Sequence, residues 1–180
     1  MLLTPHAGLA PSPWVLRWAH LIRTGGTVLD VACGSGRHMG WLAAHGWAVT
    51  GIDRDAAALA PLEGLGRIVE ADIEGGPWPL VNQRFDAVVV TNYLWRALWP
   101  ALRASLAEGG VLIYETFAQG NEAFGKPSNP AFLLRPGELL EASQGLHVVA
   151  FEDGVLDTPL RRVQRIVSVN AAAAGARHTL

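Results

Sequence analysis

The stretch Val28–His38 reads VLDVACGSGRH, and it decides the fold. An apolar run that is interrupted only by Asp30 ends in Gly34-Ser35-Gly36, and a helical pattern begins at Arg37. A buried strand that turns through glycines into a helix is the first unit of a Rossmann-like sheet. The glycines let the backbone approach a ligand closely, and the helix N-terminus offers unpaired N–H groups to it.

The segments around this unit alternate between strands and helical or connecting segments. We expect strands over Thr27–Ala32, Trp47–Ile52, Arg67–Ala71, Phe85–Thr91, Val111–Phe117, Leu146–Glu152 and Arg162–Val169. Alternation of this kind favours an α/β fold, a mainly parallel sheet with helices on both faces. The last two strands are joined by a turn around Asp153–Pro159 with no helical pattern, which indicates an antiparallel pair.

Helix signals stand at several points between the strands. Ser12-Pro13 has the pattern of a helix start, with a capping hydroxyl followed by proline at the first helical position. Further helices are expected over Arg37–His45 and Pro100–Ala107, and a short one from Pro136. Gly75–Arg84 is too broken by Gly and Pro for a helix, so one crossover is predicted to be a loop.

Composition and charge narrow the class of protein. The chain has 180 residues, 50% of them hydrophobic and 17% charged, which is typical of a globular chain. We expect one domain over 1–180, with flexible tails at 1–11 and 171–180. The formal net charge is -2 without a block of Lys or Arg, so no long-range field attracts nucleic acid.

The single cysteine, Cys33, rules out a disulfide within the chain, and no Cys or His cluster has metal-ligand spacing. The apolar runs are too short for a membrane-spanning helix. The first residues, MLLTPHAGLAPSPW, lack the charged and apolar regions of a signal peptide. A cytoplasmic protein without a metal is therefore expected.

Three classes of ligand could use the glycine turn. A P-loop needs Lys-Ser/Thr after its glycines, whereas Arg37-His38 follows here, and a dinucleotide turn needs a third glycine where Met39 stands. A carboxylate at Asp30 would repel a pyrophosphate and attract an ammonium group. Asp53 ends the second strand and can accept both hydroxyls of a ribose. A ligand with a ribose, an adenine and a cationic amino-acid end, such as S-adenosylmethionine, fits both carboxylates.

The run VLDVACGSGR followed by VTGIDRD resembles the cofactor-binding half of class I S-adenosylmethionine-dependent methyltransferases. Later segments are similar to a small bacterial branch grouped with tellurite-resistance and thiopurine-type methyltransferases: EADIEGGPWPL, FDAVVVTNYLWRALWPAL and LAEGGVLIYETFAQGNEAFGKPSNPAFLLRPGELLE. The resemblance spans about Pro13 to Asn170. It implies the sheet order 3-2-1-4-5-7-6 with strand seven antiparallel. It also implies an enzyme that uses S-adenosylmethionine and releases S-adenosylhomocysteine.

The resemblance also implies roles for individual residues. The loop would hold the methionine and ribose end of the cofactor through Ala32, Cys33, Gly34, Ser35 and Gly36. Asp53 would bind the ribose, Arg54 would pack near the adenine, and Asp72-Ile73 would read the adenine edge. Thr91-Asn92-Tyr93 would form the lip beside the transferable methyl group.

Two departures from the family pattern stand out. Ala32 occupies the place of the first glycine, where its methyl group would narrow the turn, and the missing helix after the third strand would leave the adenine edge more open.

Candidates on the acceptor side come from two places. Gln119–Pro130 is a long polar loop at the ligand end of the sheet, where such loops are often lids. The loop and the segment after the fourth strand supply the candidates Asn121, Glu122, Lys126, Tyr93, Trp95 and Arg96. Tyr93 or Glu115 would act as a base if the acceptor must lose a proton. Ordinary packing of the tryptophans and a plain solvated loop remain alternatives.

The acceptor class is inferred only from features that the sequence lacks. Thr91-Asn92-Tyr93-Leu94 lacks the Asn/Asp-Pro-Pro-Tyr/Phe signature of many methyltransferases that act on amino groups, and no basic face is visible. A small-molecule acceptor is expected, with nucleic acid unlikely, no membrane association, and a monomer or a homodimer. Two other functions stay open: a non-catalytic partner or sensor that binds S-adenosylmethionine, and an NAD(P)-dependent oxidoreductase.

Overall fold

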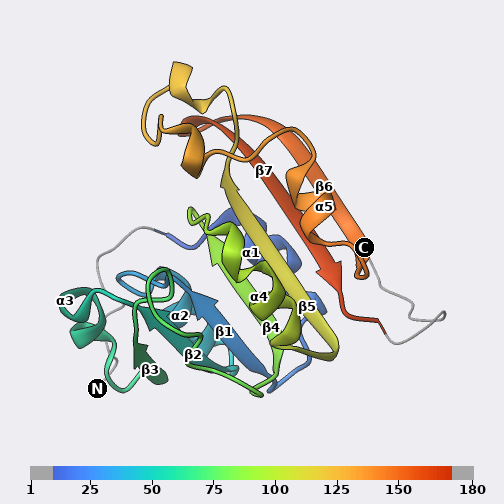
Figure 1. The fold of residues 1–180 in the computed structure, drawn as a ribbon. Coiled ribbons are helices and arrows are strands. Elements are labelled where there is room, and N and C mark those ends of the chain that lie inside the picture. Colours follow the sequence, from blue (N-terminus) through green and yellow to red (C-terminus); the bar gives the residue numbers. More distant parts are fainter. Residues whose placement is uncertain (1–9, 172–180) are drawn as a thin grey trace.

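Seven strands form one sheet in the order β3-β2-β1-β4-β5-β7-β6 (Figure 1). The computed structural model describes residues 10–171. The strands are β1 Thr27–Val31, β2 Ala48–Asp53, β3 Arg67–Glu70, β4 Phe85–Thr91, β5 Leu106–Phe117, β6 His147–Asp157 and β7 Leu160–Val169. Neighbouring strands are parallel except at β7, which runs antiparallel to both β5 and β6. The predicted strand order and the antiparallel seventh strand are confirmed.

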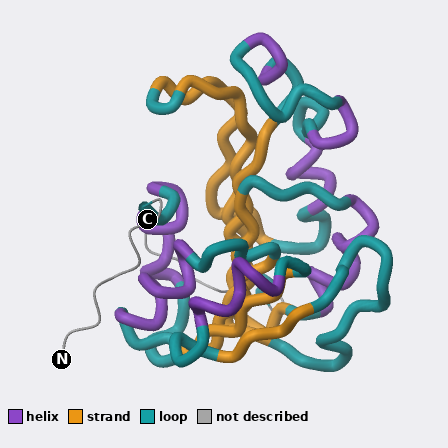
Figure 2. The backbone as a smooth tube through the Cα atoms, turned by 90° about the vertical axis from the view of Figure 1, so that its left-hand side faces the viewer, coloured by secondary structure: helices purple, strands orange, loops and turns teal. Residues whose placement is uncertain are grey.

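Helices cover both faces of the sheet, which Figure 2 shows nearly edge-on. The α-helices are α1 Pro13–Trp18, α2 Arg37–Ala44, α3 Ala56–Leu59, α4 Trp99–Ala104 and α5 Glu138–Ala142. Short 3₁₀ turns lie at Ala19–Leu21, Ala60–Leu62, Arg96–Leu98, Asn121–Ala123 and Pro130–Phe132. Between β3 and β4 the described chain holds no helix, as the sequence predicts.

Two hydrophobic cores, one on each face, explain why the central strands are apolar throughout. Val28 of β1 faces the core shared with α1, α2 and α3, whereas its neighbour Leu29 faces the core shared with α4 and α5. Side chains alternate between the faces of a strand, so a strand covered on both sides must be apolar at every position. Asp30 interrupts this run although it is as buried as its neighbours, which marks it as an exception that needs a physical reason.

Helix α1 begins as the sequence predicts. The Ser12 side chain accepts a hydrogen bond from the Trp14 N–H at 3.1 Å, and Pro13 occupies the first helical position. The cap satisfies one of the unpaired N–H groups of the first turn. The helix lays Trp14, Val15 and Trp18 on the sheet, where all three are buried.

The predicted helix over Pro100–Ala107 is too long, and the correction has a tertiary cause. Helix α4 ends at Ala104, and the chain joins β5 from Leu106. The Phe85 N–H donates to the Ser105 carbonyl at 2.8 Å, and the Asn170 side chain donates to the carbonyls of Leu106 and Ala107. These partners lie far away in the sequence, so the local pattern could not indicate them.

The turn of the last hairpin is shorter than the predicted Asp153–Pro159. Strand β6 continues to Asp157 and strand β7 begins at Leu160, which leaves only Thr158-Pro159 between them. Two ion pairs across the hairpin, Arg162–Asp153 and Arg165–Glu152, hold the extended part together. The hairpin therefore reaches past the other strands at their ligand end (Figure 1).

Among residues 10–171, no helix is long and apolar enough to cross a membrane. The predicted tails lie outside the described residues, apart from positions 10, 11 and 171.

Candidate functional site

The turn between β1 and α2 is tightly hydrogen-bonded. The Cys33 N–H donates to the Ile52 carbonyl at 3.0 Å, and the Gly36 N–H donates to the Cys33 carbonyl at 2.9 Å. Gly34 and Gly36 have left-handed φ values of 52° and 73°. A Cβ atom added to Gly36 would lie 2.5 Å from the Leu62 side chain, but one added to Gly34 would meet nothing within 4 Å. Gly36 is thus required by packing, whereas Gly34 borders open space that a ligand can approach.

Ala32 also has a left-handed φ, 52°, in this turn. The departure from the family pattern is therefore one of backbone conformation as well as of methyl-group size, because an L-residue in this conformation costs about 1–2 kcal/mol. We expect Ala32→Gly to raise the free energy of unfolding by about 1 kcal/mol. Urea denaturation checks this, as a higher midpoint at an unchanged slope. The control Ala101→Gly, inside helix α4, should lower stability by a similar amount, and a loss of stability in Ala32→Gly would contradict the expectation.

Asp30 is a buried carboxylate with one oxygen unpartnered. The residue is 1% exposed, its Oδ2 atom has no hydrogen-bond partner, and its Oδ1 atom lies 4.0 Å from His38 Nδ1. Burial raises the pKa of Asp30 to about 7, and the nearby Asp53 adds to the rise while Arg37 opposes it. A buried oxygen without a partner is costly unless a ligand satisfies it. The ammonium group of S-adenosylmethionine has the charge and the donors that this oxygen lacks.

His38 is a neutral neighbour of Asp30. Its Nε2 atom accepts a hydrogen bond from the Ser12 N–H at 3.1 Å, so the ring proton must sit on Nδ1, the atom that faces Asp30. Burial, with a contribution from Arg37, lowers the pKa of His38 to about 3. The ring therefore carries no charge at neutral pH, and it connects the N-terminus of α1 to the wall of the glycine loop.

Asp53 braces the glycine loop from the end of β2. Its Oδ2 atom accepts from the Gly34 N–H at 2.8 Å, and its Oδ1 atom accepts from the Asp55 N–H at 3.0 Å. Each carboxylate oxygen keeps a further lone pair for a ribose hydroxyl. The prediction for Asp53 thus fits the geometry. Ser35, between the two glycines, is exposed.

The residues predicted on the adenine side mostly interact with other residues of the protein. Asp72 Oδ1 accepts from the N–H groups of Glu74 and Gly75, and these bonds lower the pKa of Asp72. Arg54 lies 3.9 Å from the Glu74 carboxylate. Ile73 is buried in the core with α4 and α5. A role for Asp72 at the adenine edge depends on its other oxygen and stays a prediction, as do those of Arg54 and Ile73.

Cys33 points away from the open side of the loop. A Cβ atom on Gly51 would lie 2.9 Å from the Cys33 sulfur and 2.2 Å from the Met39 sulfur, so both side chains fill the space over Gly51. Burial strongly raises the pKa of the Cys33 thiol, with Asp30 and Asp53 adding to the rise. Any cofactor contact of Cys33 is left to its backbone.

We expect the Cys33 thiol to resist alkylation by iodoacetamide in the folded protein at about pH 8, because the thiolate is the reactive form. Mass spectrometry should show one modified thiol only after denaturation in urea. Ser35→Cys, which places a thiol at an exposed position of the same loop, should be modified rapidly in the folded state. Equal rates at both positions would contradict the burial of Cys33.

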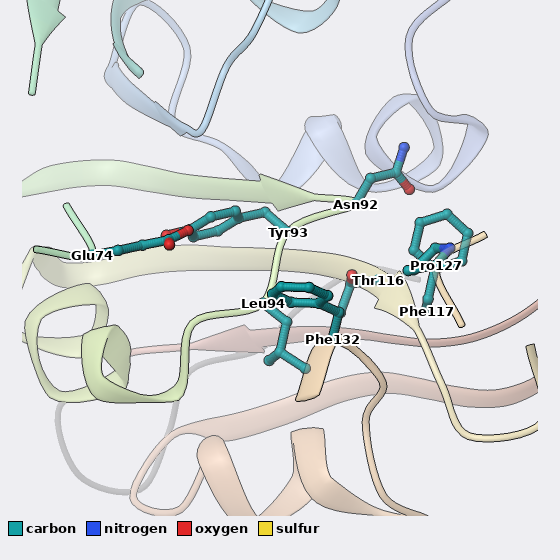
Figure 3. Close-up of a pocket in the computed structure, with 8 residues that line it drawn as sticks. All are labelled: Glu74, Asn92, Tyr93, Leu94, Thr116, Phe117, Pro127 and Phe132. Atoms are coloured by element: carbon teal, nitrogen blue, oxygen red, sulfur yellow. The ribbon is translucent and has the colours of Figure 1, made fainter. Parts of the chain in front are cut away.

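A cavity of about 220 Å³ lies at the carboxyl ends of β4 and β5 (Figure 3). Its walls are Glu74, Asn92, Tyr93, Leu94, Thr116, Phe117, Pro127 and Phe132. The sequence predicts Asn92 and Tyr93 at this place but misses the other six. Thr116 and Phe117 could have been found, because they end the strand next to β4 at the same sheet edge. Nothing in the sequence singled out Pro127 and Phe132 within their loop.

Tyr93 contributes its ring and a buried hydroxyl to this cavity. No hydrogen bond of acceptable geometry reaches the hydroxyl, although the Glu74 carboxylate lies next to it (Figure 3). Burial, and then the Glu74 charge, raises the pKa of Tyr93 well above its usual value. The hydroxyl therefore keeps its proton and is suited to donate a hydrogen bond, which disfavours the predicted role as a base.

The surroundings of Glu115 disfavour its predicted role as a base. Glu115 is fully buried on the side of β5 that faces α1, where the Ser12 hydroxyl donates to it at 3.1 Å. Arg161 and Arg165 lie 3.1 and 3.5 Å from its two oxygens. Glu115 is buried, is already contacted by two guanidinium groups and a hydroxyl, and is not among the residues that line the cavity, which disfavours a role as a base toward an acceptor there.

Arg96 and Trp95, two of the predicted acceptor-side candidates, are not among the residues that line the cavity. Arg96 binds both oxygens of buried Glu138, at 2.6 and 2.9 Å, and also donates to the carbonyls of Ala131 and Leu133. Its donors are used to fasten the loop, so it is a structural clamp. Trp95 is 36% exposed and is not part of the cavity wall. The aromatic surface there comes from Tyr93, Phe117 and Phe132 instead.

The predicted loop candidates are also corrected. Asn121 is buried, and its side chain donates to the Pro127 carbonyl and accepts from the Arg162 N–H, so it fastens the loop to β7. Glu122 accepts from the Gly120 N–H at 2.8 Å. Lys126 is exposed and lies outside the cavity wall. The segment lines the cavity through its apolar residues Pro127 and Phe132, and not through its polar ones. Within residues 10–171, no cluster of three or more His, Cys, Asp or Glu side chains could hold a metal ion.

Comparison with known proteins gives two kinds of result. Residues 28–110 match the family model described as a methyltransferase domain. A tRNA U34 carboxymethyltransferase from Shewanella amazonensis is 33% identical over 132 residues, which are 61% of this chain and 40% of the relative. A ribosomal RNA small subunit methyltransferase C from Alcanivorax borkumensis is 41% identical over 76 residues, 41% of this chain and 23% of the relative. The chain thus spans well under half the length of these curated relatives.

Solved structures share the architecture at lower identity. TehB from Haemophilus influenzae superimposes with a TM-score of 0.75 at 18% identity, over 91% of this chain and 64% of TehB. A TehB-like S-adenosylmethionine-dependent methyltransferase from Corynebacterium glutamicum gives 0.61 at 21% identity, over 86% and 85% of the two chains. At these identities the likeness shows the fold.

Proposed function

We propose that this chain, which carries a methyltransferase domain at residues 28–110 in the fold of class I S-adenosylmethionine-dependent enzymes, transfers a methyl group to a small-molecule acceptor. The shared architecture confirms the predicted fold, and the methyltransferase-domain match over residues 28–110 supports the predicted family and cofactor class. The activity of the whole chain and its acceptor are the proposal.

The observation that carries the proposal is the unpartnered Oδ2 atom of Asp30. It is buried in the last part of β1, just before the turn that contains Gly34, whose open side leaves room for a ligand. The residues present fit S-adenosylmethionine: Asp30 would hold the ammonium group, the backbone at Gly34 the methionine end, and Asp53 the ribose. Bound there, the cofactor supplies a methyl group on a positively charged sulfur that is itself a good leaving group.

The residues of the cavity supply alignment and a dry environment. Leu94, Phe117, Pro127 and Phe132 form its apolar walls. Displacement at a methyl group needs the acceptor atom in line with the bond that breaks, which is a matter of positioning. The Tyr93 hydroxyl can donate a hydrogen bond to the acceptor. An acceptor that is already nucleophilic then needs no base.

The size of the cavity supports a small acceptor. Its volume of about 220 Å³ lies below the range of roughly 300–1,000 Å³ that is usual for drug-sized ligands. A single ring with one or two substituents would fill it.

RNA is a second candidate acceptor, favoured by the names of the two curated relatives. A flipped-out base is small enough to enter a pocket of this kind. The two acceptors are separated by offering the protein S-adenosylmethionine with a labelled methyl group, together with either total RNA or a nucleic-acid-free extract of small metabolites. Label in the metabolite fraction alone supports our proposal, and label in RNA alone would overturn it.

The cofactor is tested by thermal unfolding with S-adenosylmethionine, S-adenosylhomocysteine, NAD and NADP. A ligand at 100 times its dissociation constant adds about 2.7 kcal/mol of stability, which raises the midpoint by roughly 5–11 °C in a chain of this size. We expect a shift with the two adenosyl compounds only. Asp53→Ala should lose it, whereas Asp55→Ala, which removes the cap of α3 next to the site, should retain it.

Other outcomes identify the alternatives. A shift with NAD or NADP alone would favour an oxidoreductase and overturn the proposal. Binding of S-adenosylhomocysteine without transfer of label to either fraction would favour a non-catalytic partner or sensor.

A further inference from the structure

We propose that the acceptor carries an anionic group, a carboxylate or a phosphate, which Arg161 binds at the Asn92–Phe117 end of the cavity. The inference rests on the proposed function, because it assigns the substrate class of the same site. Arg161 was not predicted from the sequence, and it belongs to β7 rather than to the loops that follow β4 and β5.

Arg161 stands directly behind two walls of the cavity. Its Nη1 atom donates to the Asn92 side chain at 3.2 Å, and its guanidinium carbon lies 5.9 Å from the centre of the Phe117 ring. Both Asn92 and Phe117 line the cavity. The side chain is only 14% exposed, so its charge is poorly screened by water.

The hydrogen-bonding capacity of Arg161 is incompletely used. Its Nη2 atom donates to Glu115 at 3.1 Å, but its Nε atom is buried and has no partner. A guanidinium group has five N–H donors, and buried donors are nearly always satisfied. A ligand oxygen would supply the acceptor that this group lacks.

A second arginine approaches the same strand end from the opposite side. Arg37 donates from Nη2 to the Thr91 hydroxyl at 3.1 Å, so Arg37 and Arg161 flank Thr91-Asn92. Burial lowers the pKa of Arg37, and the charge of Arg161 also lowers it while Glu115 acts in the opposite direction. The two cations therefore repel each other, and the nearby carboxylates of Glu115 and Asp30 oppose this effect on Arg37.

The charges around the strand end leave a positive excess. Two buried carboxylates lie there: Glu115, which Arg161 and Arg165 share, and Asp30, whose charge acts on Arg37. Arg165 also forms an ion pair with Glu152, and Arg17 forms a second ion pair with the same carboxylate. A bound sulfonium adds one more positive charge next to the cavity. An anionic acceptor is attracted to this arrangement, whereas a cationic one is repelled.

The opposite end of the cavity fixes the orientation. Glu74 lies there beside Tyr93, and its negative charge repels a carboxylate or a phosphate (Figure 3). The apolar side chains of Leu94 and Phe132 line the cavity between the two ends, and Pro127 lies beside Phe117 (Figure 3). The acceptor class that fits is a small organic anion with a flat apolar body. Its anionic group is a carboxylate or a phosphate, because a guanidinium group can bind either of them in bidentate geometry.

The test uses binding probes on the protein saturated with S-adenosylhomocysteine, so that it does not depend on knowing the acceptor. Benzoate, phenyl phosphate, benzyl alcohol and benzylammonium share one ring and differ in charge. A hydrogen bond to a charged group contributes about 1.5–3 kcal/mol, so one of the two anions should bind about tenfold or more tightly than benzyl alcohol. Benzylammonium should bind most weakly. Isothermal titration calorimetry measures the four affinities.

The variants assign the preference to one residue. Arg161→Gln should abolish the preference for the anion, and Arg162→Gln should retain it, because Arg162 is the next residue of β7 and its pair with Asp153 lies on the hairpin. Glu115 would lose one partner in Arg161→Gln, so the double variant Glu115→Gln with Arg161→Gln removes the buried charge and guards against misfolding. The double variant should also lack the preference.

Two results would overturn the inference while leaving the proposed function intact. One is equal binding of the anions and benzyl alcohol to the wild-type protein. The other is an Arg161→Gln variant that keeps the anion preference but binds S-adenosylhomocysteine more weakly, which would mean that Arg161 serves the carboxylate of the cofactor. Failure of the wild-type protein to bind S-adenosylhomocysteine at all would instead overturn the proposed function and this inference with it.

Discussion

Asp30→Asn is expected to stabilise the ligand-free protein by about 2–4 kcal/mol near pH 8 and to abolish tight binding of the cofactor. The stability gain follows from the cost of a buried charge with an unpartnered oxygen. The usual pKa of the group is 3.8, and burial raises it to about 7. One pKa unit corresponds to about 1.4 kcal/mol, so the upper end of the gain is about 4 kcal/mol.

The sign of the pH dependence follows from proton binding. Between about pH 4 and pH 7 the unfolded chain has already released the Asp30 proton while the folded protein still holds it. The folded state then binds more protons, so the free energy of unfolding falls as pH rises through this interval. Asp30→Asn removes this fall. Urea denaturation at about pH 4 and about pH 8 should show the gain only at the higher pH.

Cofactor binding should change in the opposite direction. The ammonium group of S-adenosylhomocysteine needs the ionised form of Asp30, so the affinity of the wild-type protein should fall about tenfold per pH unit below pH 7. In Asp30→Asn the affinity should be low at every pH. Calorimetric titrations over this range measure both effects.

Asp86 provides a control of opposite sign on the same sheet. Hydrogen bonds from Arg23 and Thr27 lower the pKa of Asp86 to about 2. Its contribution to stability is present above about pH 4 and is lost as pH falls toward 2. Asp86→Asn should therefore destabilise the protein at about pH 8 without affecting the cofactor. A loss of stability in Asp30→Asn as well would contradict the lack of a partner for its Oδ2 atom in the ligand-free protein.

Arg96→Ala is expected to lower the free energy of unfolding by about 3 kcal/mol. The Glu138 side chain is only 3% exposed, and Arg96 binds both of its oxygens. Removing the arginine leaves a buried carboxylate with the more exposed Arg135 as its remaining charged partner. The same change removes the hydrogen bonds from Arg96 to the carbonyls of Ala131 and Leu133. These bonds fasten the loop whose Phe132 lines the cavity.

Two controls separate the buried charge from a loss of packing. Arg23→Ala breaks a pair whose arginine is 73% exposed, and it should cost less than about 1 kcal/mol. Adding Glu138→Gln to Arg96→Ala removes the uncompensated charge and should recover a large part of the stability. Thermal unfolding of the three variants measures this. Equal losses in the single and the double variant would contradict the explanation.

The amino-acid sequence determined the parts of this protein that depend on neighbours along the chain. The strand of Val28–Val31, the glycine turn and helix α2 form one local unit, and a resemblance over most of the chain then predicted the strand order. The run FDAVVVT predicted β4 because a strand covered on both faces is mostly apolar along its covered length. Ser12-Pro13 predicted the start of α1 because a helix cap is a contact between adjacent residues.

The tertiary structure alone decided which polar side chains are free to act on a ligand. From the sequence, Glu115, Arg96 and Asn121 were all candidates for contact with a ligand. In the structure, Glu115 is hydrogen-bonded to Ser12 and Arg161. Arg96 is hydrogen-bonded to Glu138, and Asn121 to Arg162, and all of these partners lie far away along the chain. Arg161 showed no signal, because its place beside the cavity depends on β7 lying next to β5. A carboxylate or a guanidinium is chemically available only when its hydrogen bonds are unfilled, and folding across long sequence separations decides that.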